Sequence, residues 1–126
     1  MPTKRINSRE KGKRGERQLA KALQSHGVAA RRGQQFKGGD DSPDVIHEIP
    51  WVWFEHKFVE RLSLYEAYAQ AVRDAPANKM PVVSHKRKRK PILVILSLDD
   101  FMKLRLSLPY LLGEKPLNEH AKGVTK

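Results

Sequence analysis

Apolar positions recur along the chain with two different spacings, and the spacing separates predicted helices from predicted strands. Residues 13–25 carry apolar side chains, including Leu19 and Leu23, at helical intervals. Gly27 follows as a common C-terminal cap residue. We therefore expect a first helix over residues 13–25.

Two further helices are predicted from their starting residues. Ser63 is followed three residues later by Glu66, which is the pattern of a capping box, and Pro76 limits that helix. Ser97 begins the other helix ahead of two aspartates that suit the positive end of a helix dipole. Pro109 is expected to end it.

Short, continuous apolar runs mark the predicted strands. They lie at residues 28–30, 45–46, 51–54, 80–83 and 92–96. Pro50 separates the second run from the third, because proline fixes φ and cannot donate to a central ladder. The order of elements indicates an α/β fold, with a short mixed β-sheet flanked by helices.

The second and third runs carry charged residues at their outer ends, and we expect them to pair as an antiparallel hairpin. Counting back from His47 opposite Val52 places Asp44 opposite Glu55. Side chains alternate along a strand, so Glu55 and Lys57 share one face. Two carboxylates and an ammonium group suit a site for Mg²⁺ or Mn²⁺, at which the lysine orients or activates a water. The alternative is two strands whose ends carry solvated charges.

Several neighbours bear on this candidate site. Glu16 lies on the interior stripe of the first helix, where a carboxylate needs a partner. It is either a third acidic residue at the metal, or a first-turn glutamate favoured by the helix dipole. His56 should turn its ring away by alternation, although its backbone carbonyl could bind metal. Trp51 and Trp53 share the Glu55 face, and we expect them in the core rather than as platforms for stacked bases.

The charge of the chain points to polyanions. The 126 residues include 25 Lys and Arg against 14 Asp and Glu, a formal charge of +11. Nucleic acid is the first candidate partner, because Lys and Arg neutralise phosphates and release counterions; an anionic membrane surface is the alternative. We see no membrane span or signal peptide, and the absence of cysteine excludes disulfides and Cys-based zinc sites. The length suggests one domain over residues 13–112, between a flexible basic arm (1–12) and a loosely ordered tail (113–126).

Basic residues that would grip phosphates, without reading sequence, occur in several segments. They are Lys4, Arg5, Arg9, Lys13, Arg14, Arg31, Arg32, Lys37, Lys86, Arg87, Lys88, Arg89 and Lys90. The last five belong to a basic hexamer, residues 85–90, which joins the last two predicted strands. A phosphate-binding turn fits the rest of the chain better than a solvated loop or a localisation signal.

Pro43-Asp44 followed by Glu55-His56-Lys57 resembles the signature of the PD-(D/E)xK nuclease superfamily. The order of the parts narrows the resemblance. Gly15-Glu16-Arg17 opens the first helix, a glycine-rich loop runs into Ser42-Pro43-Asp44, and a helix containing Gln70 follows Lys57. Over about residues 12–100 the chain is similar to the archaeal-type (Hjc-like) Holliday junction resolvases, of which bacteria and phages also carry relatives.

This resemblance implies a restriction-endonuclease-like core and a set of site residues. Asp44, Glu55 and Lys57 would be catalytic or metal-binding, with Glu16 reaching the metal through water and Gln70 as an accessory residue. The family carries an active-site serine on a mobile loop, and Ser42 is the only serine near this position.

The resemblance also implies a function. The protein would be a homodimeric, Mg²⁺-dependent endonuclease, with Mn²⁺ as a substitute, that resolves four-way DNA junctions by symmetric hydrolysis. It would act in the cytoplasm of a bacterial, archaeal or phage-infected cell. The apolar surplus between Phe101 and Leu112 offers a surface for the dimer. The alternatives are a restriction-like or flap-trimming nuclease of the same superfamily, and a non-catalytic basic DNA-binding protein.

Overall fold

The structure is a computed structural model that describes residues 8–33 and 45–111. It confirms the α/β fold, and it divides the chain into two units, residues 1–95 and 96–126, which are described separately. The first unit contains α1 (Ser8–Ser25), β1 (Ala30–Arg32), β2 (Val45–His47), β3 (Val52–Phe58), α2 (Leu64–Asp74), β4 (Met80–Lys86) and β5 (Leu93–Ile95). The second contains α3 (Leu98–Leu111).

The strands form two small sheets. β1 and β2 pair antiparallel, with Ala30 opposite His47 and Arg32 opposite Val45. β3, β4 and β5 form a mixed sheet in which β3 is parallel to β4 and β4 is antiparallel to β5. Val52 lies opposite Met80, at the start of the parallel pair.

The expected hairpin between residues 45–46 and 51–54 is therefore wrong. β2 takes β1 as its partner, and β3 takes β4. Pro50 does lie in a turn, but the chain leaves it towards a different sheet. Parallel strands need a crossover connection, and α2 provides one between β3 and β4. β2 and β3 still approach each other, since the rings of His47 and Phe54 meet edge to face at 5.2 Å.

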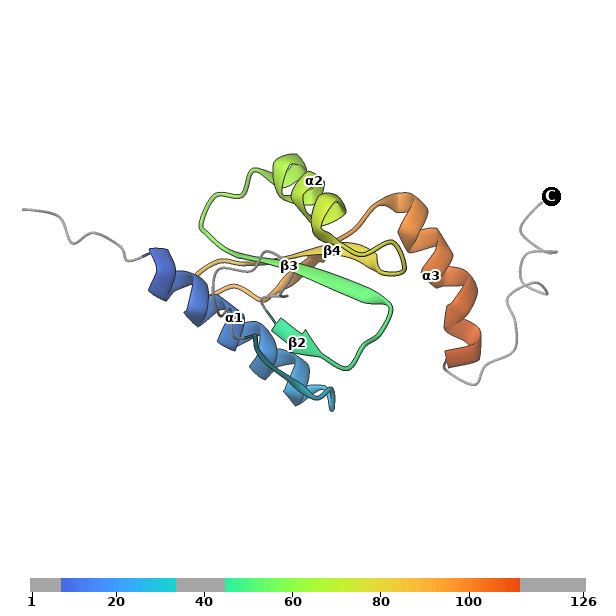
Figure 1. The fold of residues 1–126 in the computed structure, drawn as a ribbon, viewed down its shortest axis with the longest axis horizontal. Helices are drawn as coiled ribbons and strands as arrows, with labels where there is room; N and C mark the ends of the chain where they lie inside the picture. The colour runs from blue at the N-terminus through green and yellow to red at the C-terminus, as the bar shows by residue number, and fades with distance from the viewer. Residues whose placement is uncertain (1–7, 34–44, 112–126) are drawn as a thin grey trace, which may run out of the picture. The chain divides into compact units, whose positions relative to one another are not determined.

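Helices α1 and α2 lie on opposite sides of β3 and β4 (Figure 1). On the α1 side, Leu19, Ala20 and Val45 are buried and Phe54 packs against them. On the α2 side, Ala67, Ala71 and Val83 form a second buried cluster, completed by partly buried neighbours such as Ile95. Alternation along β3 thus directs successive side chains into two different environments.

The ends of the first two helices differ in part from the expectation. α1 begins at Ser8, so residues 8–12 belong to a helix and not to an arm. Gly27 has a φ of 82°, the left-handed conformation of a glycine cap, and its N–H donates to the Gln24 carbonyl at 2.9 Å. α2 begins after Ser63 and ends before Pro76, but the Ser63 side chain makes no capping hydrogen bond.

In the second unit, α3 is capped at its N-terminus by Ser97. The Ser97 hydroxyl accepts a hydrogen bond from the Asp100 N–H at 3.0 Å, as expected for an N-cap. α3 runs to Leu111, so Pro109 does not end it. Leu98, Phe101 and Leu106 are exposed. None of the described helices is long and apolar enough to cross a membrane. The expectation of a single domain over residues 13–112 stays a prediction.

α1 approaches β3 closely at Gly15. A Cβ atom on this buried glycine would lie 2.8 Å from Phe58 Cβ and 3.3 Å from His56 Cδ2. Gly12, one turn earlier, is exposed and has open space around it. Both glycines therefore lie in the same helix, but only at Gly15 would an added methyl group meet neighbouring atoms.

We expect Gly15→Ala and Gly12→Ala to change stability in opposite directions. Alanine in a helix is favoured over glycine by about 0.5–1 kcal/mol, so Gly12→Ala should stabilise the protein by that amount. At Gly15 the overpacking should outweigh this gain and destabilise the protein by about 1–3 kcal/mol. Urea unfolding of both variants measures the difference. Equal stabilisation by both would show that α1 does not press on β3 at Gly15.

Candidate active site

Lys57 lies at the centre of the candidate site. Its ammonium group donates a hydrogen bond to Gln70 Oε1 at 3.0 Å and lies 3.5 Å from Glu55 Oε2. Glu55 and Lys57 are two residues apart on β3 and so share its α2 face, as expected. Gln70 contacts Lys57 from α2. The structure therefore brings together three of the five predicted catalytic residues.

Glu55 is a buried carboxylate, with a relative exposure of 6%. Such a group is costly in a protein interior unless it is paired or binds a cation. The Lys57 ammonium provides one positive charge at close range. Val83, the residue opposite Glu55 on β4, is fully buried, so this part of the sheet has an apolar wall. The arrangement holds the Glu55 carboxylate and the Lys57 ammonium group in a fixed orientation, with little solvent around the carboxylate.

The remaining predicted acids do not complete a metal site within the described residues. Asp44 lies outside them, as does Ser42, so their places in the site stay predictions. Glu16 is partly buried on α1, and its Oε1 accepts a hydrogen bond from Arg32 Nε at 3.0 Å. Within residues 8–33 and 45–111, no three His, Asp or Glu side chains gather as a metal-binding group. The Glu55 carboxylate is nonetheless a ligand of the right kind, because carboxylate oxygens suit hard divalent cations.

His56 points away from Glu55, as alternation predicts. Its Nδ1 lies 2.8 Å from the hydroxyl of Ser84, the residue opposite it on β4, and the ring approaches Gly15 of α1. Its Nε2 is buried and has no hydrogen-bond partner among the described residues. Burial, followed by the electrostatic interaction with the nearby His85, lowers the pKa of His56 to about 4. The side chain is therefore a neutral packing residue.

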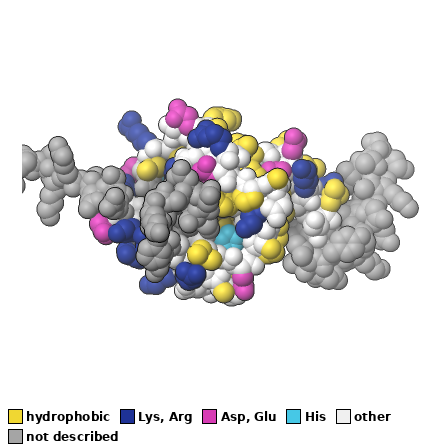
Figure 2. Space-filling model, in the orientation of Figure 1, with side chains coloured by type: hydrophobic (Ala, Val, Ile, Leu, Met, Phe, Trp, Pro, Cys, Tyr) yellow, Lys and Arg dark blue, Asp and Glu magenta, His cyan; other side chains and the backbone are white. Residues whose placement is uncertain are grey.

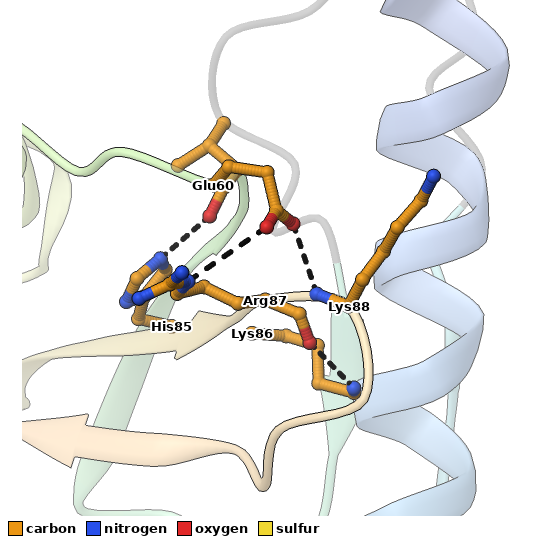
Figure 3. A network of polar contacts seen from close by, with 6 residues as sticks. Glu60, His85, Lys86, Arg87 and Lys88 are labelled. Atoms are coloured by element: carbon orange, nitrogen blue, oxygen red, sulfur yellow. Dashed lines mark hydrogen bonds and ion pairs between the residues drawn. The ribbon is translucent and has the colours of Figure 1, made fainter.

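The basic hexamer is an organised turn rather than a free loop. β4 extends to Lys86, and the chain turns over residues 87–90 before β5. The Glu60 carboxylate accepts a hydrogen bond from the Lys88 backbone N–H at 2.9 Å and lies 3.8 Å from Arg87 Nε (Figure 3). The hydrogen bond from Lys88 is the main reason why the pKa of Glu60 is lowered. Glu60 thus anchors the turn to the chain that leaves β3.

Other contacts restrict the conformation of this turn further. His85 Nε2 lies 2.7 Å from the Val59 carbonyl, and Lys86 Nζ donates to the Arg87 carbonyl at 2.7 Å (Figure 3). Arg89 has a φ of 62°, in the left-handed region that favours glycine. The side chains of residues 87–90 are exposed. The turn therefore presents charge to solvent from a defined backbone.

The other predicted phosphate contacts fall into different groups. Lys and Arg side chains gather over α1 and beside α2 (Figure 2). Arg14 and Arg31 are exposed, whereas Lys13 lies 3.7 Å from Glu10 and Arg32 is paired with Glu16. Lys4, Arg5, Lys37 and the side chain of Arg9 lie outside the described part of the chain.

The expectation that both tryptophans belong to the core is wrong for Trp51. This side chain is 44% exposed, because Trp51 lies in the turn before β3 rather than in the strand. Its carbonyl instead accepts a hydrogen bond from Met80 at 2.8 Å, which starts the β3–β4 ladder. Trp53 is partly buried on β3.

A pocket beside Lys57 was not anticipated. It has a volume of about 440 Å³ and is lined by residues that include Lys57, Arg61, Glu66, Gln70 and Arg73. The periodicity of α2 contains the relevant signal, because residues 66, 70 and 73 fall on one helix face. The position of Arg61 depends on the path of the chain between β3 and α2, for which the sequence has no comparable signal.

Fold and site together define a class of protein. An α/β core with Glu55 and Lys57 on one strand, flanked by helices, is that of a PD-(D/E)xK nuclease. The family model described as archaeal Holliday junction resolvase (Hjc) matches residues 7–70, just over half of the 126 residues. The chain therefore belongs to the archaeal Holliday junction resolvase family. No curated protein and no solved structure shows a significant match to it.

The buried, neutral His56 should make the folded state sensitive to acid. Its pKa is about 4 in the folded protein and about 6.5 when unfolded, so the unfolded chain binds the proton first. Its contribution to stability is complete above about pH 6.5 and is lost as the pH falls towards 4. The loss should reach about 2–3 kcal/mol.

Urea unfolding between pH 7 and pH 4 in metal-free buffer measures this loss. His56→Gln, which cannot titrate, should flatten the pH profile across the window. His26→Gln, at an exposed histidine after α1, is the control and should keep the profile of the unmodified protein. A profile that His56→Gln leaves unchanged would contradict the assignment.

Proposed function

We propose that the protein is a divalent-metal-dependent endonuclease that resolves four-way DNA junctions by hydrolysing two phosphodiester bonds symmetrically. The observation that carries this proposal is the contact of Lys57 with Glu55 and Gln70 on the α2 side of β3. Membership of the archaeal Holliday junction resolvase family supports the substrate, and the formal charge of +11 supports binding to a polyanion.

In the proposed chemistry the carboxylates bind the metal ion, and Lys57 acts on the water or the phosphate. Asp44 and Glu55 would hold Mg²⁺ or Mn²⁺, the His56 carbonyl would be a further ligand, and Glu16 would reach the ion through water. When bound, such an ion polarises the phosphate and lowers the pKa of a coordinated water. Lys57 orients the attacking water or stabilises the negative charge that develops on the phosphate. Gln70 and Glu55 limit the positions that the Lys57 ammonium can take, which is the function of a preorganised site.

Symmetric resolution requires two active sites related by a two-fold axis, so we propose that the protein acts as a homodimer. α3 contributes to this proposal through its exposed apolar residues Phe101, Met102 and Leu106. An isologous contact between two copies would remove these side chains from water.

Substitution of the central residues should separate cleavage from binding. Asp44→Asn, Glu55→Gln and Lys57→Ala should each lower the cleavage rate of a four-way junction by at least about 100-fold, because each removes a group that acts on the reacting phosphate. Binding in Ca²⁺ should change little, since many other cations contact the backbone. Gln70→Ala should have a smaller effect, because it removes a positioning contact only.

The assay compares a four-way junction, a linear duplex and a flap, each with Mg²⁺, Mn²⁺, Ca²⁺ or EDTA. Mg²⁺ and Mn²⁺ should support cutting of the junction, and EDTA should stop it. Full activity in any of the first three variants would remove that residue from the site. Equal cutting of all three substrates would favour a less selective nuclease of the superfamily, and binding without cutting would favour a non-catalytic role.

The basic turn should contribute to affinity without contributing to selectivity. Replacing Lys86 to Lys90 by serine should weaken binding to all three DNA forms and flatten its salt dependence. Each lost phosphate contact should lower the salt slope by about one unit. Unchanged affinity and slope would identify the turn as a solvated loop.

Glu60 allows a sharper test of whether the shape of this turn matters. Glu60→Gln removes a negative charge but keeps an oxygen that can accept from Lys88, whereas Glu60→Ala removes both. If the turn must be anchored, Glu60→Ala should bind DNA about 2–5-fold more weakly, and Glu60→Gln at least as tightly as the unmodified protein. Tighter binding by both variants would show that only charge matters.

A further inference from the structure

We propose that the pocket beside Lys57 is a phosphate subsite, in which Arg61 and Arg73 hold a backbone phosphate near the one that is cut. This inference rests on the proposed nuclease function, because it takes Lys57 as the reacting end of the pocket. It adds a second point of contact for the same DNA strand. The lining of the pocket includes none of the basic residues of the turn or of α1.

The pocket has the size and position that such a subsite needs. Its volume of about 440 Å³ lies within the range of roughly 300–1,000 Å³ that is usual for small-molecule sites, so a phosphate with its sugar would fit. Lys57 and Gln70, which are in direct contact, form part of its lining. A strand that lies in the pocket would therefore pass the Lys57 ammonium.

The charged side chains around the pocket favour an anion. Lys57, Arg61 and Arg73 supply three cationic groups, whereas the acids are Glu66 in the lining and Glu55, which is paired with Lys57. A guanidinium group binds a phosphate through two parallel hydrogen bonds, which gives it an advantage in affinity and in orientation. Ser63 also lines the pocket, and its hydroxyl makes no capping bond to α2, so it can donate a hydrogen bond to the anion.

The two arginines differ from Arg32 and Arg87 in their internal contacts. Arg32 is held by Glu16, and Arg87 lies near Glu60. In contrast, the exposed side chains of Arg61 and Arg73 have no hydrogen bond or ion pair within residues 8–33 and 45–111. Their guanidinium groups can therefore bind a ligand without breaking an internal contact.

The geometry of α2 gives the subsite a direction. Glu66, Gln70 and Arg73 are spaced at intervals of four and three residues, so they form one stripe along the helix. Gln70 contacts Lys57, and Arg73 lies one turn further along the stripe. We infer that the DNA backbone follows this stripe, with one phosphate at Lys57 and a neighbouring phosphate at Arg73, while Arg61 lines the same pocket from the chain before α2.

The test measures coupling between the arginines and single phosphates. Four-way junctions that carry one methylphosphonate at successive positions around the cutting site are bound in Ca²⁺, without turnover. The proteins are the unmodified chain, Arg61→Gln, Arg73→Gln and the control Lys21→Gln. Lys21 is exposed on α1 and does not line the pocket. Circular dichroism checks that each variant is folded.

One neutralised phosphate should weaken binding of the unmodified protein by about 3–10-fold, because a charge-assisted contact is lost. The same modification should have no further effect on Arg61→Gln or Arg73→Gln, but its full effect on Lys21→Gln. Glu66→Gln should strengthen binding. Additive losses at every position would overturn the proposal.

Free anions provide the second arm of the experiment. Inorganic phosphate is titrated into the protein without DNA by calorimetry. Micromolar binding that Arg61→Gln abolishes, with no coupling to a junction phosphate, would assign the pocket to a free anion and overturn our assignment. Binding is measured without turnover, so the two proposals can fail separately. If the arginines are coupled to a junction phosphate but the protein never cuts DNA, only the nuclease function is refuted. A protein that cuts without coupling would refute the subsite alone.

Discussion

The parallel pairing of β3 with β4 is the constraint on which the site depends. Parallel neighbours cannot be joined by a tight turn, so the chain must cross one face of the sheet before it returns, and α2 makes that crossing. The crossing decides what each side of β3 meets. Lys57 meets Gln70 because α2 covers its face, while His56 meets Ser84 and α1 on the other.

The parts of the fold that depend on local signals could be predicted from the sequence. Helical spacing and Gly27 locate α1, and alternation places Glu55 and Lys57 together with His56 opposite. Strand partners could not be predicted in this way, since pairing depends on contacts far apart in the chain. A hairpin across Pro50 satisfied every local rule, yet the packing of α2 on β4 and of α1 on β1 and β2 gave both strands other partners.

The pairing of charged side chains also depends on contacts between residues far apart in the chain. The position of Glu16 on the interior stripe indicated that it needs a partner, and one partner is Arg32, a residue that was itself predicted to contact DNA. A count of basic residues cannot tell an arginine that is held by a carboxylate from one that is available. In the structure, internal pairing separates Arg32 and Arg87 from Arg61 and Arg73, and these groups should differ in what they contribute to binding.

Arg89 has a consequence for attempts to make this protein more robust. Its left-handed backbone costs about 1–2 kcal/mol for a residue with a side chain, and glycine would adopt the same conformation without that cost. A thermostability screen that ignores activity would therefore tend to replace this arginine early. Directed evolution of the protein would need selection for DNA handling at every round, because the most economical stabilising change at this turn also removes a charge.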